Sequence, residues 1–202
     1  MSIETDKIFK LLSEEGFKDP ATGRLFFPAY IYTYNPADEY EMRREIQRLN
    51  EMLSRPNNNL RSMLINVFDE FLEYLKGQEF DNSNILEEVI RLEQDDSSEA
   101  NKYLTEEAKD KFVDYMGEKF SNYFAGNMTG KVYLLVHGFG SIYPWLRVSH
   151  FLKNTEKYIK NFKIIVFYPG EFSDDTYSLF GKLNDDNVYR ANHINELIKS
   201  TK

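Results

Sequence analysis

Two segments of the chain consist almost entirely of apolar residues, and both predict buried strands. They are residues 131–138 (KVYLLVHG) and residues 162–170 (FKIIVFYPG). A strand with one face in water alternates apolar and polar residues, whereas a continuous apolar run is typical of a central strand buried on both faces. Residues 25–34 and 61–71 also favour strands, and the second merges into a helix at about Asp69.

Between these strands, apolar residues recur at the spacing of amphipathic helices. One helix start is well marked at Asn35-Pro36, because Asn caps a helix and Pro suits its first turn. The polar run DDSSEAN at 95–101 predicts a loop, and Pro144 predicts an early helix position. The predicted helices are 3–16, the segment after Asn35-Pro36, about 69–77, 84–94, 104–124, about 144–152, 156–160 and 188–198, with a small hairpin before the last.

Strands that alternate with helices predict an α/β fold with parallel crossovers. We expect one domain over residues 1–202, with a small, open, mostly parallel, Rossmann-like sheet of four to five strands flanked by helices. Extra helices between the second and third strands form an insert at about 69–125. Ligands of such sheets bind beyond the carboxyl ends of the strands. The loops there are Tyr34-Asn35-Pro36, His137–Pro144 and Tyr168–Asp175.

The composition narrows the protein class. The chain has no cysteine, which excludes a disulfide framework, a thiol nucleophile and a zinc site with cysteine ligands. Aromatic residues make up 15%, a supply that suits both a core and a contact surface. The segment MSIETDKIFKLL lacks the pattern of a signal peptide, and no window approaches 18 apolar residues. We therefore expect a cytoplasmic protein with no membrane contact.

The charge is unevenly distributed along the chain. A net charge of −8 argues against autonomous DNA binding, which depends on cationic groups that neutralise phosphates. Residues 83–99 hold six acids and one base, whereas residues 147–163 hold five bases and one acid. The second segment predicts either a local basic face or, as charge runs more often do, a solvated helix surface.

No string in the sequence completes a catalytic or cofactor motif. HGFGS after a strand is typical of an α/β-hydrolase oxyanion loop, but the G-x-S-x-G elbow of that fold is missing. The glycines of Gly138-Phe139-Gly140 lack the third glycine of a dinucleotide fingerprint. His137, His150 and His193 have no metal-ligand spacing, and the acid pairs at 174–175 and 185–186 favour turns over a magnesium site. The sequence predicts no catalytic residue, no metal and no cofactor.

Two arginines and one tryptophan are candidates for recognition. Arg147 and Arg190 either clamp an acidic group or phosphate of a partner, or pair internally with a carboxylate such as that of Glu171 or Asp174. Trp145, beside Tyr143, suits either a core position or an interface anchor. The sequence leaves both alternatives open.

The last third of the chain carries a recognisable series of motifs. In order, these are GFGSIYPWLRVSHFLKN, IIVFYPGEF, LFG and NVYRANHI. The series resembles the BrxB family of bacterial BREX anti-phage defence systems, and the layout of the N-terminal half is similar too. The segment Val188-Tyr189-Arg190-Ala191 departs mildly from the family pattern, which has two aromatics in a row.

The resemblance implies a small non-catalytic component that works beside a DNA methyltransferase, a large ATPase and the phosphatase-like protein PglZ. We therefore expect an interaction or scaffold subunit whose most favoured partner is PglZ, with DNA contacted only through the complex. The alternatives are a nucleotide- or nucleic-acid-binding module at the carboxyl edge, and a cryptic hydrolase or nuclease. The predicted recognition residues are Tyr143, Pro144, Trp145, Arg147, Tyr168, Pro169, Gly170, Tyr189 and Arg190.

Overall fold

The computed structural model of the chain describes residues 4–18, 28–58, 60–125, 131–160, 162–173, 176–185 and 191–200. Its helices are α1 (Thr5–Ser13), α2 (Glu15–Lys18), α3 (Glu39–Ser54), α4 (Val67–Lys76), α5 (Ile85–Asp95), α6 (Ser97–Lys109), α7 (Lys111–Phe124), α8 (Phe139–Ile142), α9 (Val148–Thr155) and α10 (Ile194–Ser200), with short 3₁₀ helices η2 (Pro36–Asp38) and η3 (Glu156–Tyr158). Its strands are β1 (Ala29–Tyr34), β2 (Arg61–Asn66), β3 (Glu79–Phe80), β4 (Ser83–Asn84), β5 (Lys131–His137), β6 (Lys163–Ser173), β7 (Thr176–Leu179), β8 (Leu183–Asn184) and β9 (Asn192–His193).

The central sheet is mostly parallel. In the part of the chain that the structure describes, the strands lie in the order β2-β5-β6-β1-β9, and every neighbouring pair along this path is parallel. The far end of β6 also pairs antiparallel with β7, and β7 with β8. The α/β class and the parallel core are therefore as predicted. The antiparallel extension enlarges the sheet to seven strands instead of four or five, and the Rossmann-like layout stays a prediction.

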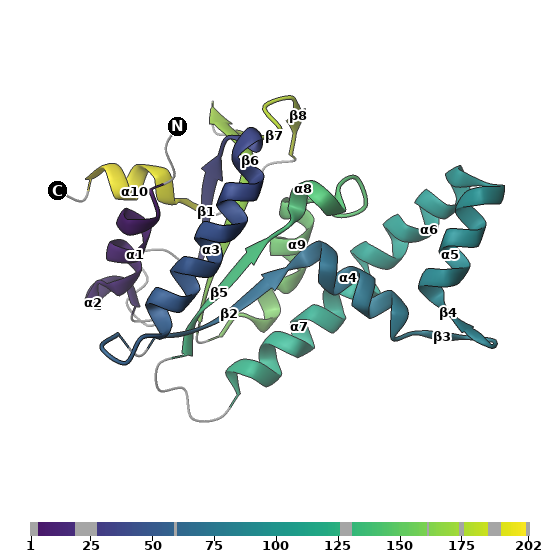
Figure 1. Ribbon diagram of the computed structural model, residues 1–202, viewed down its shortest axis with the longest axis horizontal. Coiled ribbons are helices and arrows are strands. Elements are labelled where there is room, and N and C mark those ends of the chain that lie inside the picture. Colours follow the sequence, from purple (N-terminus) through teal and green to yellow (C-terminus); the bar gives the residue numbers. More distant parts are fainter. Residues whose placement is uncertain are drawn as a thin grey trace.

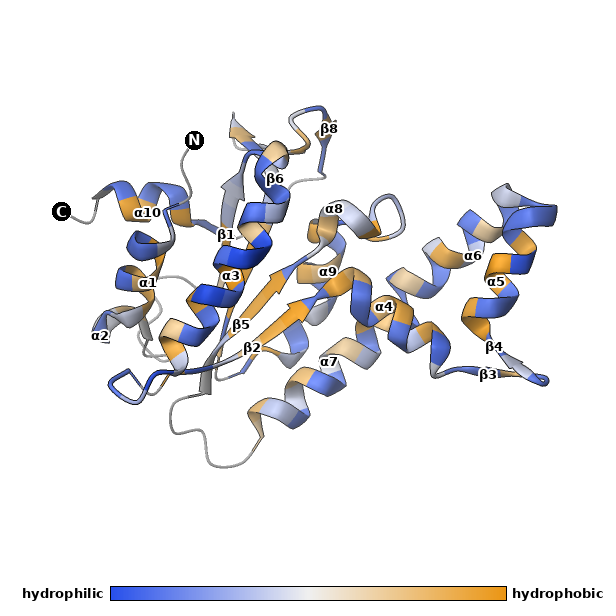
Figure 2. Cartoon of the chain, in the orientation of Figure 1, coloured by the Kyte–Doolittle hydropathy of each residue, from blue (hydrophilic) through white to orange (hydrophobic). Residues whose placement is uncertain are grey.

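Helices cover both faces of this sheet (Figure 1), as the continuous apolar runs predicted. On one face, buried residues of α1, α3 and α10 share a core cluster with Tyr133 and Leu135 of β5. On the other face, buried residues of α4, α7, α8 and α9 share a core cluster with Leu134 and Val136 of the same strand. In Figure 2 the strands β2 and β5 are mainly apolar, whereas much of the neighbouring α3 is polar.

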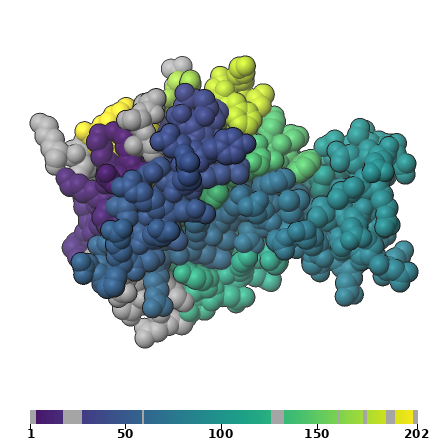
Figure 3. All heavy atoms as spheres, viewed as in Figure 1, coloured from purple at the N-terminus to yellow at the C-terminus, as the bar shows by residue number. Residues whose placement is uncertain are grey.

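Helices α4 to α7 lie between β2 and β5 in the chain. The division into one domain with a helical insert at about 69–125 stays a prediction. Helix α7 lies against β2, where the Tyr123 hydroxyl donates to the carbonyl oxygen of Ser62 at 3.3 Å. Beyond it, residues 78–110, which we name the arm, stand away from the sheet as a separate lobe (Figures 1 and 3). The arm comprises the hairpin β3–β4 and helices α5 and α6.

Two predictions about the insert were wrong. The segment 95–101 is not a loop, because α6 begins at Ser97 and Asp96 caps it: the Asp96 carboxylate accepts from the backbone N–H groups of Ser98 and Glu99 at 3.0 Å each. The single helix expected over 104–124 is also interrupted, since Asp110 leaves the helical conformation between α6 and α7. No helix among the described residues has the length and apolar character needed to cross a membrane.

Candidate functional site at the carboxyl edge of the sheet

The parallel strands bring the predicted loops together at one edge. Tyr34 at the end of β1 is in register with Pro169 of β6, and Asn66 at the end of β2 is in register with His137 of β5. The connections that follow these strands therefore meet at the same edge, as predicted for a parallel sheet. The acid pair at 174–175 lies outside the described residues.

A small recess, which we name the Tyr168 recess, opens at this edge between α8, α9 and the hairpin β7–β8. It has room for about one water molecule. Aliphatic and aromatic side chains form most of its wall, and a few residues contribute polar groups. The lining residues are Phe139, Tyr143, Leu146, Arg147, Val148, Tyr168, Leu179, Leu183, Asn184 and Asp185.

The turn that begins this site depends on Gly138. This residue follows β5 directly, has φ +92° and starts α8. A Cβ atom here would lie 2.1 Å from the side-chain oxygen of Asn66, which caps α4 by accepting from the backbone N–H of Phe68 at 3.2 Å. Glycine is therefore required both by the left-handed backbone and by the close approach of the neighbouring cap.

The connection between α8 and α9 corrects the prediction for Pro144. This proline does not begin a helix; it lies in a turn over Tyr143–Trp145 after a cis peptide bond, and α9 starts at Val148. Pro144 is exposed and does not line the recess. Arg147 occupies the N-cap position of α9, and its guanidinium donates to the main-chain oxygen of Asn184 at 3.4 Å. The arginine thus ties the start of α9 to the hairpin.

Tyr168 lines the recess and has a buried hydroxyl. Its side chain is 1% exposed, and its hydroxyl has no hydrogen-bond partner among the described residues. Burial, reinforced by the negative charge of Asp185, raises the pKa of Tyr168, so the phenol stays protonated. A buried hydroxyl without a partner costs about 1–3 kcal/mol. A donor or acceptor placed in the recess would remove that cost.

The hairpin adds an apolar rim to this edge. Phe180 and Leu183 are 39% and 38% exposed, although both are large apolar side chains. The ring of Phe180 lies against Gly140, where a Cβ atom would approach it to 3.1 Å. Leu183 lines the recess itself. The recess and its rim together form a small, mainly apolar surface with few polar groups.

The other predicted recognition residues do not reach the recess. Trp145 instead donates its indole N–H to the side-chain oxygen of Asn101 at 3.0 Å, which joins the edge loop to α6 of the arm. Pro169 and Gly170 are buried within β6, where Gly170 pairs with Leu179 of β7. Tyr189 and Arg190 lie outside the described residues. Of the nine predicted residues, the structure brings Tyr143, Arg147 and Tyr168 together.

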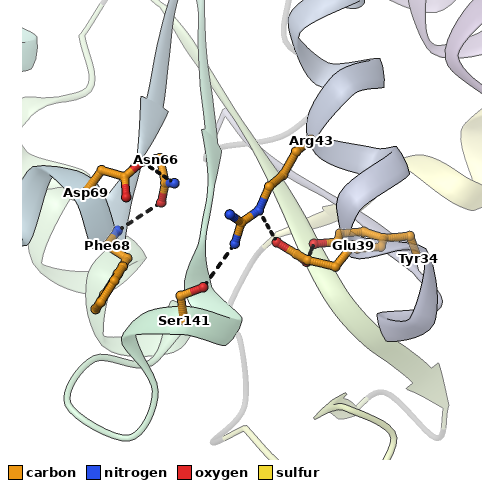
Figure 4. A network of polar contacts seen from close by, with 7 residues as sticks. All are labelled: Tyr34, Glu39, Arg43, Asn66, Phe68, Asp69 and Ser141. Carbon is orange, nitrogen blue, oxygen red and sulfur yellow. Dashed lines mark hydrogen bonds and ion pairs between the residues drawn. The ribbon is translucent and has the colours of Figure 1, made fainter.

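Sequence reasoning missed a second polar group at the same edge (Figure 4). Arg43 of α3 donates to Glu39 at 2.8 Å and to the hydroxyl of Ser141 at 3.1 Å. The Tyr34 hydroxyl donates to the other oxygen of Glu39 at 2.5 Å. Burial, and then the hydrogen bond to Glu39, raises the pKa of Tyr34. The spacing of Glu39 and Arg43, one helical turn apart directly after a strand, was the available signal.

His137 lies close to this network but is not bonded to it. The side chain is 8% exposed, and its Nδ1 has no hydrogen-bond partner among the described residues. Burial, and then the positive charge of Arg43, lowers the pKa of His137, so the ring is neutral at pH 7. Nearby, the Asn66 side-chain amide donates to Asp69 at 2.6 Å.

The three histidines have different surroundings. His150 Nε2 is hydrogen-bonded to the carbonyl oxygen of Lys109 at 2.9 Å, and His193 stacks on Phe172 with 4.4 Å between ring centroids. Among the described residues no three histidine, aspartate or glutamate side chains are placed to hold a metal ion.

The basic segment 147–163 does not form a continuous exposed face. Lys163 is 1% exposed and donates to the carbonyl oxygen of Phe17, with its ammonium over the Phe17 ring. Lys157 forms an ion pair with Asp114 at 2.8 Å. Helix surface with internal contacts therefore describes residues 147–163 better than a local basic face.

Comparison with known proteins adds the family. The family model described as BREX protein BrxB matches residues 63–194, a range that includes the whole arm and every residue lining the recess. The chain is 24% identical over 186 residues to a BREX protein BrxB of Bacillus cereus (strain H3081.97), covering 92% of this chain and 93% of that protein. No solved structure matches. The chain belongs to the BrxB family, and this membership implies a role in a BREX phage-defence system.

Proposed function

We propose that the chain is a non-catalytic subunit of its BREX system that acts by binding other proteins of the system. The observation that carries the proposal is the Tyr168 recess with its rim. Tyr143, Arg147 and Tyr168 line one recess, and Leu183 exposes 38% of its apolar side chain beside it. Tyrosine, arginine and exposed apolar groups around a small depression are characteristic of protein interface anchors.

The size of the recess supports a protein partner over a small substrate. Small-molecule sites usually measure roughly 300–1,000 Å³ and enclose most of the ligand. The Tyr168 recess has room for about one water, which suits the tip of one side chain from a partner. A polar tip would also reach the Tyr168 hydroxyl.

The resemblance to the BrxB family directs the choice of partner. We propose PglZ as the protein that docks at this edge, with the methyltransferase and the ATPase of the system reached through the assembled complex. Contact with DNA is then indirect, and the complex works in the cytoplasm. The chain would contribute surface and position, not a chemical step.

Co-purification tests this proposal directly. The tagged chain is co-expressed with the other proteins of its BREX system, and PglZ in the eluate is quantified. We expect Phe180→Asp and Leu183→Asp to remove PglZ, because each buries a carboxylate in an apolar contact. Gln47→Asp is the matched control, since it adds the same charge on the exposed face of α3.

Two results would contradict the proposal. Retention of PglZ by both rim variants would show that this edge is not the docking surface. A wild-type chain that remains alone at micromolar concentration beside all other components would remove the interaction role itself. A titration with duplex DNA at low salt, run in parallel, tests the nucleic-acid alternative.

The absence of a catalytic role is tested separately. Ser141 accepts a hydrogen bond from Arg43, and His137 is buried and neutral. We expect Ser141→Ala and His137→Gln to retain phage protection when assayed by plaque counts on cells that carry the full system. Loss of protection by folded variants that still co-purify with PglZ would favour an enzyme instead.

A further inference from the structure

The arm carries the whole net charge of the protein. Residues 79–110 contain eleven acids and three bases, a net charge of −8. The remaining residues contain 22 acids and 22 bases, because the whole chain has 33 and 25. The structure places this charge on the lobe that stands farthest from the sheet (Figure 3). The sheet domain and the arm therefore present very different surfaces to other molecules.

Few of these acids are neutralised within the arm. Nine of the eleven are exposed, and Glu107 is the buried one. In the described part of the chain, ion pairs involve two of them: Glu88 pairs with Arg91 at 2.5 Å, and Glu107 pairs with Lys111 at 3.0 Å. Of the others, Glu87 accepts hydrogen bonds from the side chains of Ser83 and Asn84, and Asp96 accepts from backbone N–H groups, and none of these donors carries a positive charge. A cationic partner surface would gain from this field without first breaking internal pairs.

Helix α5 also leaves apolar side chains without full cover. It has five apolar residues, and just one of them, Val89, is buried. Ile85, Leu86 and Leu92 are partly buried and pack, with Val89, against the core cluster of the insert. Ile90 lies outside this contact and is 48% exposed.

The hairpin beside α5 extends this surface. Strands β3 and β4 both contact α5, and Phe80 of β3 is 46% exposed. Exposed large apolar residues that occur singly are ordinary. Here Phe80 and Ile90 occur on one small lobe that is otherwise strongly acidic, which is the arrangement of an interface with an apolar centre and a charged rim.

We propose that the outer side of α5 and the hairpin β3–β4 form a second docking surface, which takes a basic protein surface with apolar side chains at its centre. The field of the arm attracts lysine and arginine, and the exposed side chains of Ile90 and Phe80 accept the apolar groups. Nucleic acid is repelled by the same charge. The surface uses none of the residues of the Tyr168 recess, so one chain has two separate docking surfaces and can bridge two proteins.

The first experiment measures binding of a fluorescent amphipathic lysine–leucine peptide to the full chain by fluorescence anisotropy at low salt. The arm variant is Glu93→Lys, Asp95→Lys and Glu106→Lys together, three exposed acids that take part in none of the ion pairs described above. The control is Glu41→Lys, Glu51→Lys and Glu118→Lys, which changes the total charge equally on α3 and α7. We expect the arm variant to lose about tenfold or more in affinity, and the control to lose less than about threefold.

The apolar part is tested on Ile90. Replacement by Ser removes the exposed aliphatic group with little effect on the fold, and we expect about a fivefold loss for the same peptide. Equal losses in the arm variant and its control would show a response to total charge alone and would overturn the proposal. So would unchanged binding in both, or a wild-type chain that binds duplex DNA and not the peptide.

The second experiment separates this surface from the recess. The tagged chain and its variants are co-expressed with the other BREX proteins, and each component in the eluate is quantified. We expect the arm variant to lose a component that Leu183→Asp retains. If the arm variant retains every component, the second surface is wrong even where the recess is right. Far-ultraviolet circular dichroism and thermal melting test whether each variant is folded. If the arm variant is not folded, a version with Gln, Asn and Gln at the same three positions replaces it.

Discussion

The sheet and the arm differ in how deeply their side chains are buried. In β5, each side chain from Tyr133 to Val136 is fully buried, and helices cover both faces. In α5, Val89 is the one apolar side chain that is fully buried, and the helix packs mainly on its neighbours α4 and α6. Buried apolar contacts set local stability, so the sheet is the stable unit and the arm is the part that opens most easily. The chain thus combines a well-packed sheet with an exposed, acidic arm.

The largest difference in stability is expected between two large-to-small substitutions, one in the sheet and one in the arm. Phe167 of β6 is fully buried, and we expect Phe167→Ala to lower the free energy of unfolding by about 4 kcal/mol. Val89→Ala in α5 removes fewer atoms from a thinner core, and we expect about 1 kcal/mol. Urea titrations followed by circular dichroism measure both. Equal effects would mean that the arm is as tightly packed as the sheet.

The turn after β5 should be the next most sensitive position. Gly138→Ala combines a left-handed backbone with a Cβ atom at 2.1 Å from Asn66, and we expect a loss of about 2 kcal/mol. Gly16→Ala is the control, because its Cβ atom meets nothing within 4 Å. The control should change stability by less than about 1 kcal/mol. A tolerated alanine at 138 would mean that the turn relaxes.

Removal of one helix cap should affect the arm alone. Asp96→Ala deletes two hydrogen bonds at the start of α6, and we expect local destabilisation of about 1 kcal/mol. Hydrogen exchange of the α6 amides should speed up while exchange in β5 stays unchanged. Asp110→Ala is the matched control, since this aspartate precedes α7 without a side-chain cap bond. Faster exchange throughout the sheet would show that the two regions unfold together.

The smallest expected effect is on the pH dependence of stability. The folded state lowers the pKa of His137 below its ordinary value of 6.5, so the unfolded chain binds the proton first. This histidine therefore leaves stability unchanged well above pH 6.5 and reduces it as the pH falls below that value. We expect His137→Gln to flatten the loss between pH 7 and pH 5 in urea titrations. His193→Gln should do the same in part, because burial also lowers its pKa. A steeper loss of stability in the His137 variant would contradict a lowered pKa of His137 in the folded state.

The features that sequence patterns predicted are local. Continuous apolar runs identified β5 and β6, because a strand buried on both faces has no polar positions. The position of the insert followed from its helical spacing. The start of α6 was not predicted, because the polar composition of residues 95–101 is also typical of a loop. The signal for a helix start was Asp96 with Glu99 three residues later.

The site was predicted less completely than the fold. Tyr143 and Arg147 follow β5, and Tyr168 lies in the neighbouring strand β6, so the parallel topology brings them to one edge. Arg43 meets Ser141 across 98 positions of the chain, and such a contact depends on how α3 packs over the sheet. Pro144 was assigned to a helix by its residue type, whereas the turn at Tyr143–Trp145 is fixed by tertiary contacts.

Trp145 has a practical consequence for the study of this protein. It is the single tryptophan of the chain, and its indole nitrogen is bonded to Asn101 at the base of the arm, beside the loop that leads to the recess. The emission of an indole shifts with its hydrogen bonding and exposure. The unlabelled protein therefore contains its own optical probe at the junction of its two regions, and a titration with either partner can be followed by fluorescence alone.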